Sequence, residues 1–127
     1  MKHDITAMRF YHIHDKDNGN AIVGTVCLVK GNAMNKYTWS RGISICSMDD
    51  RFEKRKGRAV ALARARRANG TWKDSDPILV PFKRNWNVRD AARRFKTAAQ
   101  KYYGLYSVAK SAYNVVPTEY ENSMLED

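Results

Sequence analysis

The chain begins with stretches that alternate between apolar and polar residues and are rich in strand-forming side chains. The first covers residues 9–15, RFYHIHD, and the second, AIVGTVCLVK, starts at Ala21. Asn18 and Gly19 lie between them, and both tolerate the positive φ of a tight hairpin turn. A third strand is predicted by the stretch YTWSRGISICS. We therefore expect an antiparallel β-meander of about three strands over residues 1–47.

A helix rich in arginine and alanine is predicted to follow the meander. Ser47 lies three residues before Asp50, which resembles a capping box, and Asn69-Gly70 is typical of a helix end. A rotation of about 100° per residue groups four apolar side chains on one face, which we expect to contact the core. These four are Phe52, Ala59, Leu62 and Ala63.

The opposite side of this helix carries only small residues. Gly57 and Ala61 lie four residues apart, and Ala65 and Ala68 extend the same side. Such a side permits the close approach of a second helix, a second subunit or a ligand. Alanine is also a good helix former in any setting. The small side therefore has two interpretations, close approach or helix propensity alone.

A second helix shows the most regular periodicity in the chain. Asn87 is its candidate cap, Asp90 follows three residues later, and Gly104 is expected to end it. Its apolar face is formed by Val88, Ala91, Ala92, Phe95, Ala98, Ala99, Tyr102 and Tyr103. Before this helix, the run ILVPFK contains Pro81, which favours an edge strand or an extended connector. The segment LYSVAKSAYNVV, which starts after Gly104, fits a helix or a strand equally well.

A sheet followed by helices predicts an α+β fold in which two main helices cover one face of the meander. The length of 127 residues suits a single domain, with a helical part and short edge strand over 48–104 and an acidic tail over 114–127. Within this tail the stretch VPTEYENSMLED is expected to be loosely held. Cys27 and Cys46 are interpreted as buried thiols. No apolar run could span a bilayer and the N-terminus has no apolar signal core, so we expect a cytoplasmic protein.

The net charge of +10 is concentrated in two segments. Residues 41–67 hold nine basic and three acidic side chains, and residues 83–101 hold seven basic and one acidic side chain. Residues 114–127 hold four acidic side chains and no basic one. Basic clusters separated in this way favour an anionic partner, most often phosphate, over charge that only aids solubility.

The chain offers no good catalytic or metal-binding constellation. His12 and His14 would share one face of a strand, but a third ligand is not evident. The turn DKDNGN fails as a calcium loop, because Asn20 and Val26 stand where glycine and a bidentate glutamate are needed. We therefore predict a protein that is not an enzyme and has no metal or cofactor. A nuclease using both histidines is the enzyme alternative.

Arginine outnumbers lysine in the first basic helix, and guanidinium groups bind phosphate in a fork and stack on flat bases. Trp86 follows two cations in KRNW, which suits a nucleobase with its phosphate, although Trp86 suits a core position equally well. The predicted ligand-binding residues are Arg41, Arg55, Arg58, Arg64, Phe82, Arg84, Trp86, Arg89 and Arg93.

The stretch from Arg41 to Ala68, RGISICSMDDRFEKRKGRAVALARARRA, contains a strand that ends in Cys and a small residue. Asp, Phe, a basic run, Gly-Arg and a helix of alternating Ala and Arg then follow. The matching positions are Gly42, Cys46, Asp50, Phe52, Gly57, Arg58, Ala61, Arg64 and Ala65. Over this quarter of the chain the sequence resembles the small phage-encoded anti-Thoeris sponge proteins.

The resemblance implies an N-terminal sheet, C-terminal helices and a homo-oligomer with pockets between subunits. It also implies a phage-type immune-evasion protein that sequesters a cyclic nucleotide signal, cyclic ADP-ribose-like or a cyclic oligonucleotide, without cleaving it. The resemblance likewise implies an anti-defence role, and capture of a cyclic oligonucleotide would make that role anti-CBASS. The alternative is a basic nucleic-acid-binding protein of phage type, whose two basic helices follow a phosphate backbone.

Overall fold

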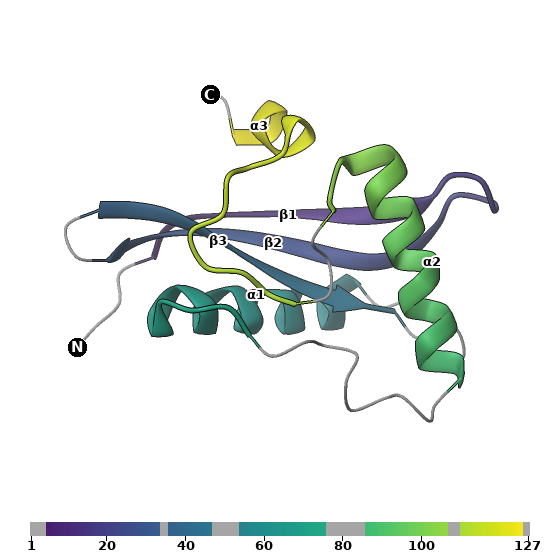
Figure 1. Ribbon diagram of the computed structural model, residues 1–127, viewed down its shortest axis with the longest axis horizontal. Coiled ribbons are helices and arrows are strands. Elements are labelled where there is room, and N and C mark those ends of the chain that lie inside the picture. The colour runs from purple at the N-terminus through teal and green to yellow at the C-terminus, as the bar shows by residue number, and fades with distance from the viewer. Residues whose placement is uncertain (1–4, 34–35, 47–53, 76–85, 107–109, 126–127) are drawn as a thin grey trace.

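The computed structural model describes residues 5–33, 36–46, 54–75, 86–106 and 110–125. It has the α+β architecture expected from the sequence, with an N-terminal sheet packed against helices (Figure 1). The elements are β1 (Ile5–Asp15), β2 (Ala21–Ala33), β3 (Lys36–Ile45), α1 (Lys54–Thr71), α2 (Trp86–Tyr103) and α3 (Glu119–Leu125).

The sheet is the predicted antiparallel meander, in the order β1-β2-β3. The hairpin between β1 and β2 lies where the sequence placed it, but Gly19 and Asn20 adopt positive φ, rather than Asn18 and Gly19. The backbone N–H groups of Asn18 and Asn20 both donate to the carbonyl of Asp15, at 3.1 and 2.9 Å. Asn20 in the left-handed region closes the turn at small cost, because asparagine tolerates it.

Strand β2 is apolar on both of its faces, and this determines how the helices are arranged. Val26 and Leu28 point into the larger core cluster with α2, whereas Cys27 and Val29 point into a second cluster with α1. A strand buried on both sides needs a cover on each, because alternate side chains point to opposite faces. The expectation that both helices cover one face was therefore wrong, and α1 and α2 enclose the sheet between them (Figure 1).

Helix α1 turns its small residues toward the sheet, which corrects the predicted core face. Ala61, Ala65 and Ala68 are buried, whereas Ala59 and Ala63 are exposed and Leu62 is half-buried. Phe52 and the proposed cap, Ser47 with Asp50, lie outside the described residues.

The partner of this small side is Gly42 on β3. A Cβ atom at Gly42 would stand 2.0 Å from the carbonyl oxygen of Ala61 and 2.4 Å from the amide nitrogen of Ala65. The helix backbone thus rests almost directly on the strand, which large side chains on either element would prevent. Of the two interpretations of the small side, close approach is correct, and the element that approaches is the chain's own sheet.

Helix α2 has the predicted core face. Ala91, Ala92, Phe95, Ala98, Ala99 and Tyr103 are buried, and Tyr102 is half-buried. The Phe95 ring lies over Gly24 of β2, where a Cβ atom would come within 2.3 Å of the ring. Gly104 ends the helix with φ of 69°, as expected. Helix α1 instead runs one residue past Gly70, and Trp72 takes the left-handed conformation.

The described part of the C-terminal segment, through Leu125, is held against the sheet rather than loosely attached, which corrects the expectation. Ala112 exchanges backbone hydrogen bonds with Arg41 at 2.8 and 2.9 Å, and Val115 N–H donates to the Trp39 carbonyl at 2.8 Å. The segment therefore covers part of the outer edge of β3 before it reaches α3 (Figure 1). A covered edge cannot pair with another sheet.

Helix α3 begins with a reciprocal capping box. Glu121 N–H donates to the Thr118 hydroxyl at 3.1 Å, and Thr118 N–H donates to the Glu121 carboxylate at 3.0 Å. The Glu121 side chain is fully buried, so this cap also docks α3 on the sheet.

Both cysteines were expected to be buried, and one of them is. Cys27 is buried, and this burial raises the pKa of its thiol to about 12, whereas Cys46 is only half-buried. The run containing Pro81 lies outside the described residues.

Among the helices that the structure describes, none combines the length and apolar character needed to cross a bilayer.

Candidate functional site

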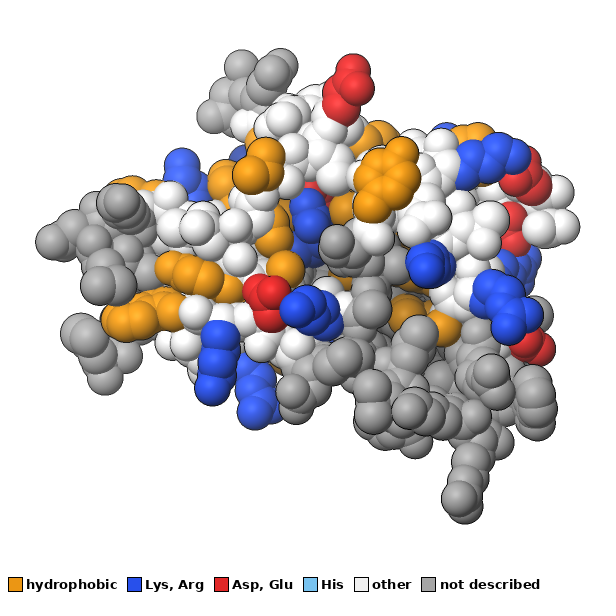
Figure 2. Space-filling view, in the orientation of Figure 1, with side chains coloured by type: hydrophobic (Ala, Val, Ile, Leu, Met, Phe, Trp, Pro, Cys, Tyr) orange, Lys and Arg blue, Asp and Glu red, His pale blue; other side chains and the backbone are white. Residues whose placement is uncertain are grey.

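The solvent face of α1 is a surface of exposed cations. Burial of the small side against Gly42 leaves the long basic side chains to project from the molecule. Six of them are exposed, namely Lys54, Arg55, Lys56, Arg58, Arg66 and Arg67. The helix contains no acidic residue, and none of the six forms an ion pair within the described part of the chain. Basic side chains extend from the side of the molecule where α1 lies (Figure 2). We call these six residues the α1 basic face.

The first turns of α1 lie beside an aromatic ring and a histidine of β1. The Arg58 guanidinium is 5.7 Å from the centre of the Phe10 ring, a cation–π geometry. On the same face of the sheet, the ring of His12 makes a hydrogen bond of 3.1 Å with the Thr25 hydroxyl. Burial, followed by the positive charges of Arg58 and Lys54, lowers the pKa of His12. Lys54 and Arg58 therefore lie close enough to the His12 ring for their charges to act on it, in the same direction as burial.

Arg41 is not available to a ligand, although it was predicted to bind one. Its guanidinium donates to both carboxylate oxygens of Glu121, with the Nε bond at 2.9 Å. Tyr11 donates its hydroxyl to the same carboxylate at 2.6 Å. Burial raises the pKa of Tyr11, and the charge of Glu121 acts in the same direction, so the phenol stays a donor. Arg41 is a structural residue that holds α3.

Arg64 is also used within the fold. Its Nη1 donates to the carbonyl of Ile43 at 2.6 Å, at the end of β3. Burial lowers the pKa of the guanidinium, and the side chain is half-buried. Arg64 thus fastens α1 to β3 and retains only part of its surface for an anion.

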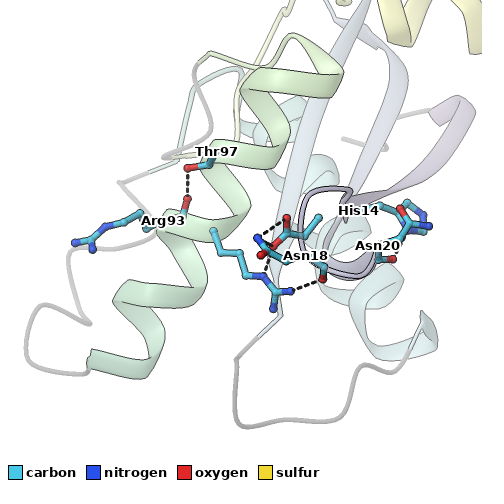
Figure 3. Close-up of polar contacts among 7 residues, drawn as sticks. His14, Asn18, Asn20, Arg93 and Thr97 are labelled. Carbon is cyan, nitrogen blue, oxygen red and sulfur yellow. Dashed lines mark hydrogen bonds and ion pairs between the residues drawn. The ribbon is translucent and has the colours of Figure 1, made fainter.

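Arg93 is exposed on α2, on the other side of the sheet from α1. Its side chain extends away from the hairpin, and its backbone carbonyl accepts a hydrogen bond from the Thr97 hydroxyl at 3.0 Å (Figure 3). The next residue, Arg94, instead points to the hairpin and pairs with the buried carboxylate of Asp15. The hydrogen bond from Arg94 lowers the pKa of Asp15 below its usual range.

The predicted ligand-binding residues whose side chains the structure describes lie in different places within the chain. Arg55 and Arg58 share the α1 basic face, Arg93 lies on the opposite layer, and Arg41 is buried. Phe82 and Arg84, and the side chains of Trp86 and Arg89, lie outside the described residues.

The arrangement of the histidines does not support the metal alternative. His12 engages Thr25, and the His14 ring makes a contact of 3.2 Å with the Asn20 carbonyl oxygen. A register irregularity at Ile13/His14 interrupts the alternation on which the shared face was predicted. Among the described residues, no group of three or more His, Cys, Asp or Glu side chains could hold a metal ion.

Four members of the α1 basic face were not predicted as ligand-binding: Lys54, Lys56, Arg66 and Arg67. The signal that identifies them is the absence of any acidic residue between positions 54 and 71, which is visible in the sequence.

Comparisons with protein-family models, with curated proteins and with solved structures found no match to this chain.

Proposed function

We propose that the protein binds the phosphate backbone of nucleic acid through the α1 basic face. The observation that carries this proposal is a helix of 18 residues with six exposed cations, no acidic residue and no ion pair among the described residues to neutralise them. Lysine and arginine side chains that remain unpaired in this way bind phosphates and release the counterions condensed on them.

The spread of these cations favours a long polyanion over a compact one. A helix of 18 residues extends over about 27 Å, and the cations occupy both of its ends, at positions 54–58 and 66–67. Successive phosphates of one strand lie about 3.4 Å apart along a duplex. One backbone can therefore meet cations along the whole helix, which a single small nucleotide cannot do.

The capture of a small cyclic nucleotide, as in an immune-evasion sponge, is the second candidate. The observation in its favour is the concentration of Lys54, Arg55, Lys56 and Arg58 beside Phe10 at one end of α1. A compact phosphorylated ligand could bind these cations and leave Arg66 and Arg67 unused. The two candidates therefore differ in whether the distant end of the helix contributes.

The test is a salt titration of nucleic-acid binding with charge-removing variants. The double variant Arg66→Gln/Arg67→Gln should weaken binding of a labelled oligonucleotide and flatten the dependence of log K on log salt. Two lost phosphate contacts reduce the slope by roughly 1.4 to 1.8 units. Arg93→Gln/Lys96→Gln, at two exposed positions of α2, removes the same two charges away from α1 and is the control for a change in net charge alone.

Equal slopes for the wild type and the double variant would exclude Arg66 and Arg67 from the contact. If the protein bound no nucleic acid at low salt, the first candidate would be wrong. Thermal stabilisation by cyclic nucleotides, with the ligand recovered unchanged after denaturation and no effect of Arg66→Gln/Arg67→Gln, would then support the second.

A further inference from the structure

Lys30, Tyr37 and Trp39 form an aromatic patch with a cation at one end of the sheet. Lys30 of β2 pairs with Trp39 of β3, and their side chains point to the sheet face opposite α1. Tyr37 lies two residues before Trp39 and therefore shares this face. The Lys30 ammonium is 5.8 Å from the centre of the Tyr37 ring and 5.9 Å from that of Trp39. We call these three residues the aromatic patch.

The two rings of the patch differ in how they are held. Trp39 is half-buried and packs against the larger core cluster, to which Met124 and Leu125 of α3 also contribute. Tyr37 is 57% exposed and belongs to neither core cluster. The patch thus combines a fixed ring, an open ring and a cation between them.

This combination matches the chemistry of an unpaired nucleotide. An aromatic side chain stacks on the face of any base, and a nearby cation binds the adjoining phosphate. A base inside a duplex has both faces covered by its neighbours, so it cannot stack on Tyr37 without being extruded.

The patch lies on the opposite face of β3 from the last turn of α1. The Asn69 side-chain amide, in the last turn of α1, donates to the Ser40 hydroxyl at 2.8 Å and to the Thr38 carbonyl at 3.3 Å. Thr38 lies between Tyr37 and Trp39 along β3. The C-terminal segment covers the edge of β3 at Trp39 and Arg41, so a polynucleotide that contacts both regions must bend around β3 ahead of Trp39. A flexible single strand can make this bend, whereas a duplex is too stiff over so short a distance.

We propose that Lys30, Tyr37 and Trp39 form a stacking site for an unpaired base, so that the nucleic acid bound by this protein is single-stranded. This inference rests on the proposed function of the α1 basic face, and it adds a second contact region on the opposite face of the sheet.

The test compares a labelled oligothymidylate with a duplex of equal length, at one salt concentration, by fluorescence polarisation. Tyr37→Ala should weaken binding of the single strand by roughly 5- to 140-fold and leave the weaker duplex binding unchanged, since only the stacked base is lost. Tyr37→Phe should retain the affinity, because it keeps the ring. Tyr106→Ala is the matched control, as Tyr106 is 76% exposed and distant in sequence from the patch.

The outcomes separate this inference from the proposed function. If Tyr37→Ala folds, as judged by circular dichroism, and binds the single strand as tightly as the wild type, the stacking site is wrong. If Arg66→Gln/Arg67→Gln still weakens binding in that case, the α1 basic face stands without it. If neither nucleic acid binds the wild type, both proposals are overturned.

Discussion

Replacing Gly42 with alanine tests whether α1 packs against the sheet as closely as the distances at Gly42 indicate. The added Cβ atom would stand 2.0 Å from the Ala61 carbonyl oxygen, 2.4 Å from the Ala65 amide nitrogen and 2.9 Å from the Ala65 Cβ. Two of these three atoms belong to the helix backbone, which cannot rotate away as a flexible side chain can. The substitution therefore forces α1 outward or distorts β3.

The size of the effect follows from the overlap. Non-bonded carbon atoms attract best at about 3.5 to 4.0 Å, so the helix must retreat by more than about 1 Å. Extra methyl groups in well-packed cores typically cost about 1 to 3 kcal/mol, occasionally more. We expect a loss of about 3 kcal/mol in the free energy of unfolding, because a retreat also loosens the contacts of Ala61 and Ala65 with Cys27 and Val29.

Urea unfolding followed by circular dichroism measures this loss. Gly70→Ala is the matched control, because Gly70 also belongs to α1 but a Cβ atom added there would meet nothing within 4 Å. Alanine in place of this helical glycine should leave stability unchanged or raise it by up to about 1 kcal/mol. If Gly42→Ala were within about 0.5 kcal/mol of the wild type, the close seating of α1 would be refuted.

Two further predictions concern buried carboxylates. Glu121→Gln should lower the free energy of unfolding by about 3 to 5 kcal/mol in urea titrations, because it leaves Arg41 buried without its counter-charge. Glu119→Gln, on the exposed side of α3, should change it by less than about 0.5 kcal/mol. Asp15→Asn should destabilise the protein at neutral pH, and the difference from the wild type should shrink as the pH falls. The pairing with Arg94 lowers the folded-state pKa of Asp15, so its contribution is complete above the unfolded value of about 3.9 and is lost as the pH falls through the folded value. A wild-type-minus-variant difference that stayed constant down to the acid limit would contradict this linkage.

Sequence periodicity predicted α2 well and α1 badly, for a physical reason. The core face of α2 includes Phe95 and Tyr103, large apolar side chains whose spacing marks the buried side. The buried side of α1 consists of alanines and Asn69, whereas the predicted core face was centred on Phe52 and included Leu62, which are larger apolar side chains. The side of α1 that faces the sheet is determined by Gly42, which lies on β3. A helical wheel of α1 contains no information about the strand that this helix contacts.

The docking of the C-terminal segment was predictable only in part. Thr118 and Glu121 have the spacing of a capping box, so the start of α3 could have been identified from the sequence. The partner of Glu121 is Arg41, 80 positions earlier, and no local pattern connects them. Arg41 was predicted to bind a ligand. The sequence around it does not show that a carboxylate contacts it in the fold.

Close packing buries the small side of α1 against the sheet, so the cations of the helix lie together on its solvent face. Cations three or four residues apart, such as Lys54 and Arg55 with Arg58, repel each other by roughly 0.2 to 0.5 kcal/mol per pair in a helix. The described chain supplies no carboxylate to relieve this repulsion on the six exposed members. The helix is therefore stabilised by its contact with the sheet and destabilised by its own charge. A partner that brings phosphates to this face removes the repulsion on binding, so binding and helix stability should increase together. A local conflict of this kind, compensated elsewhere in the fold, is what a functional surface is expected to show.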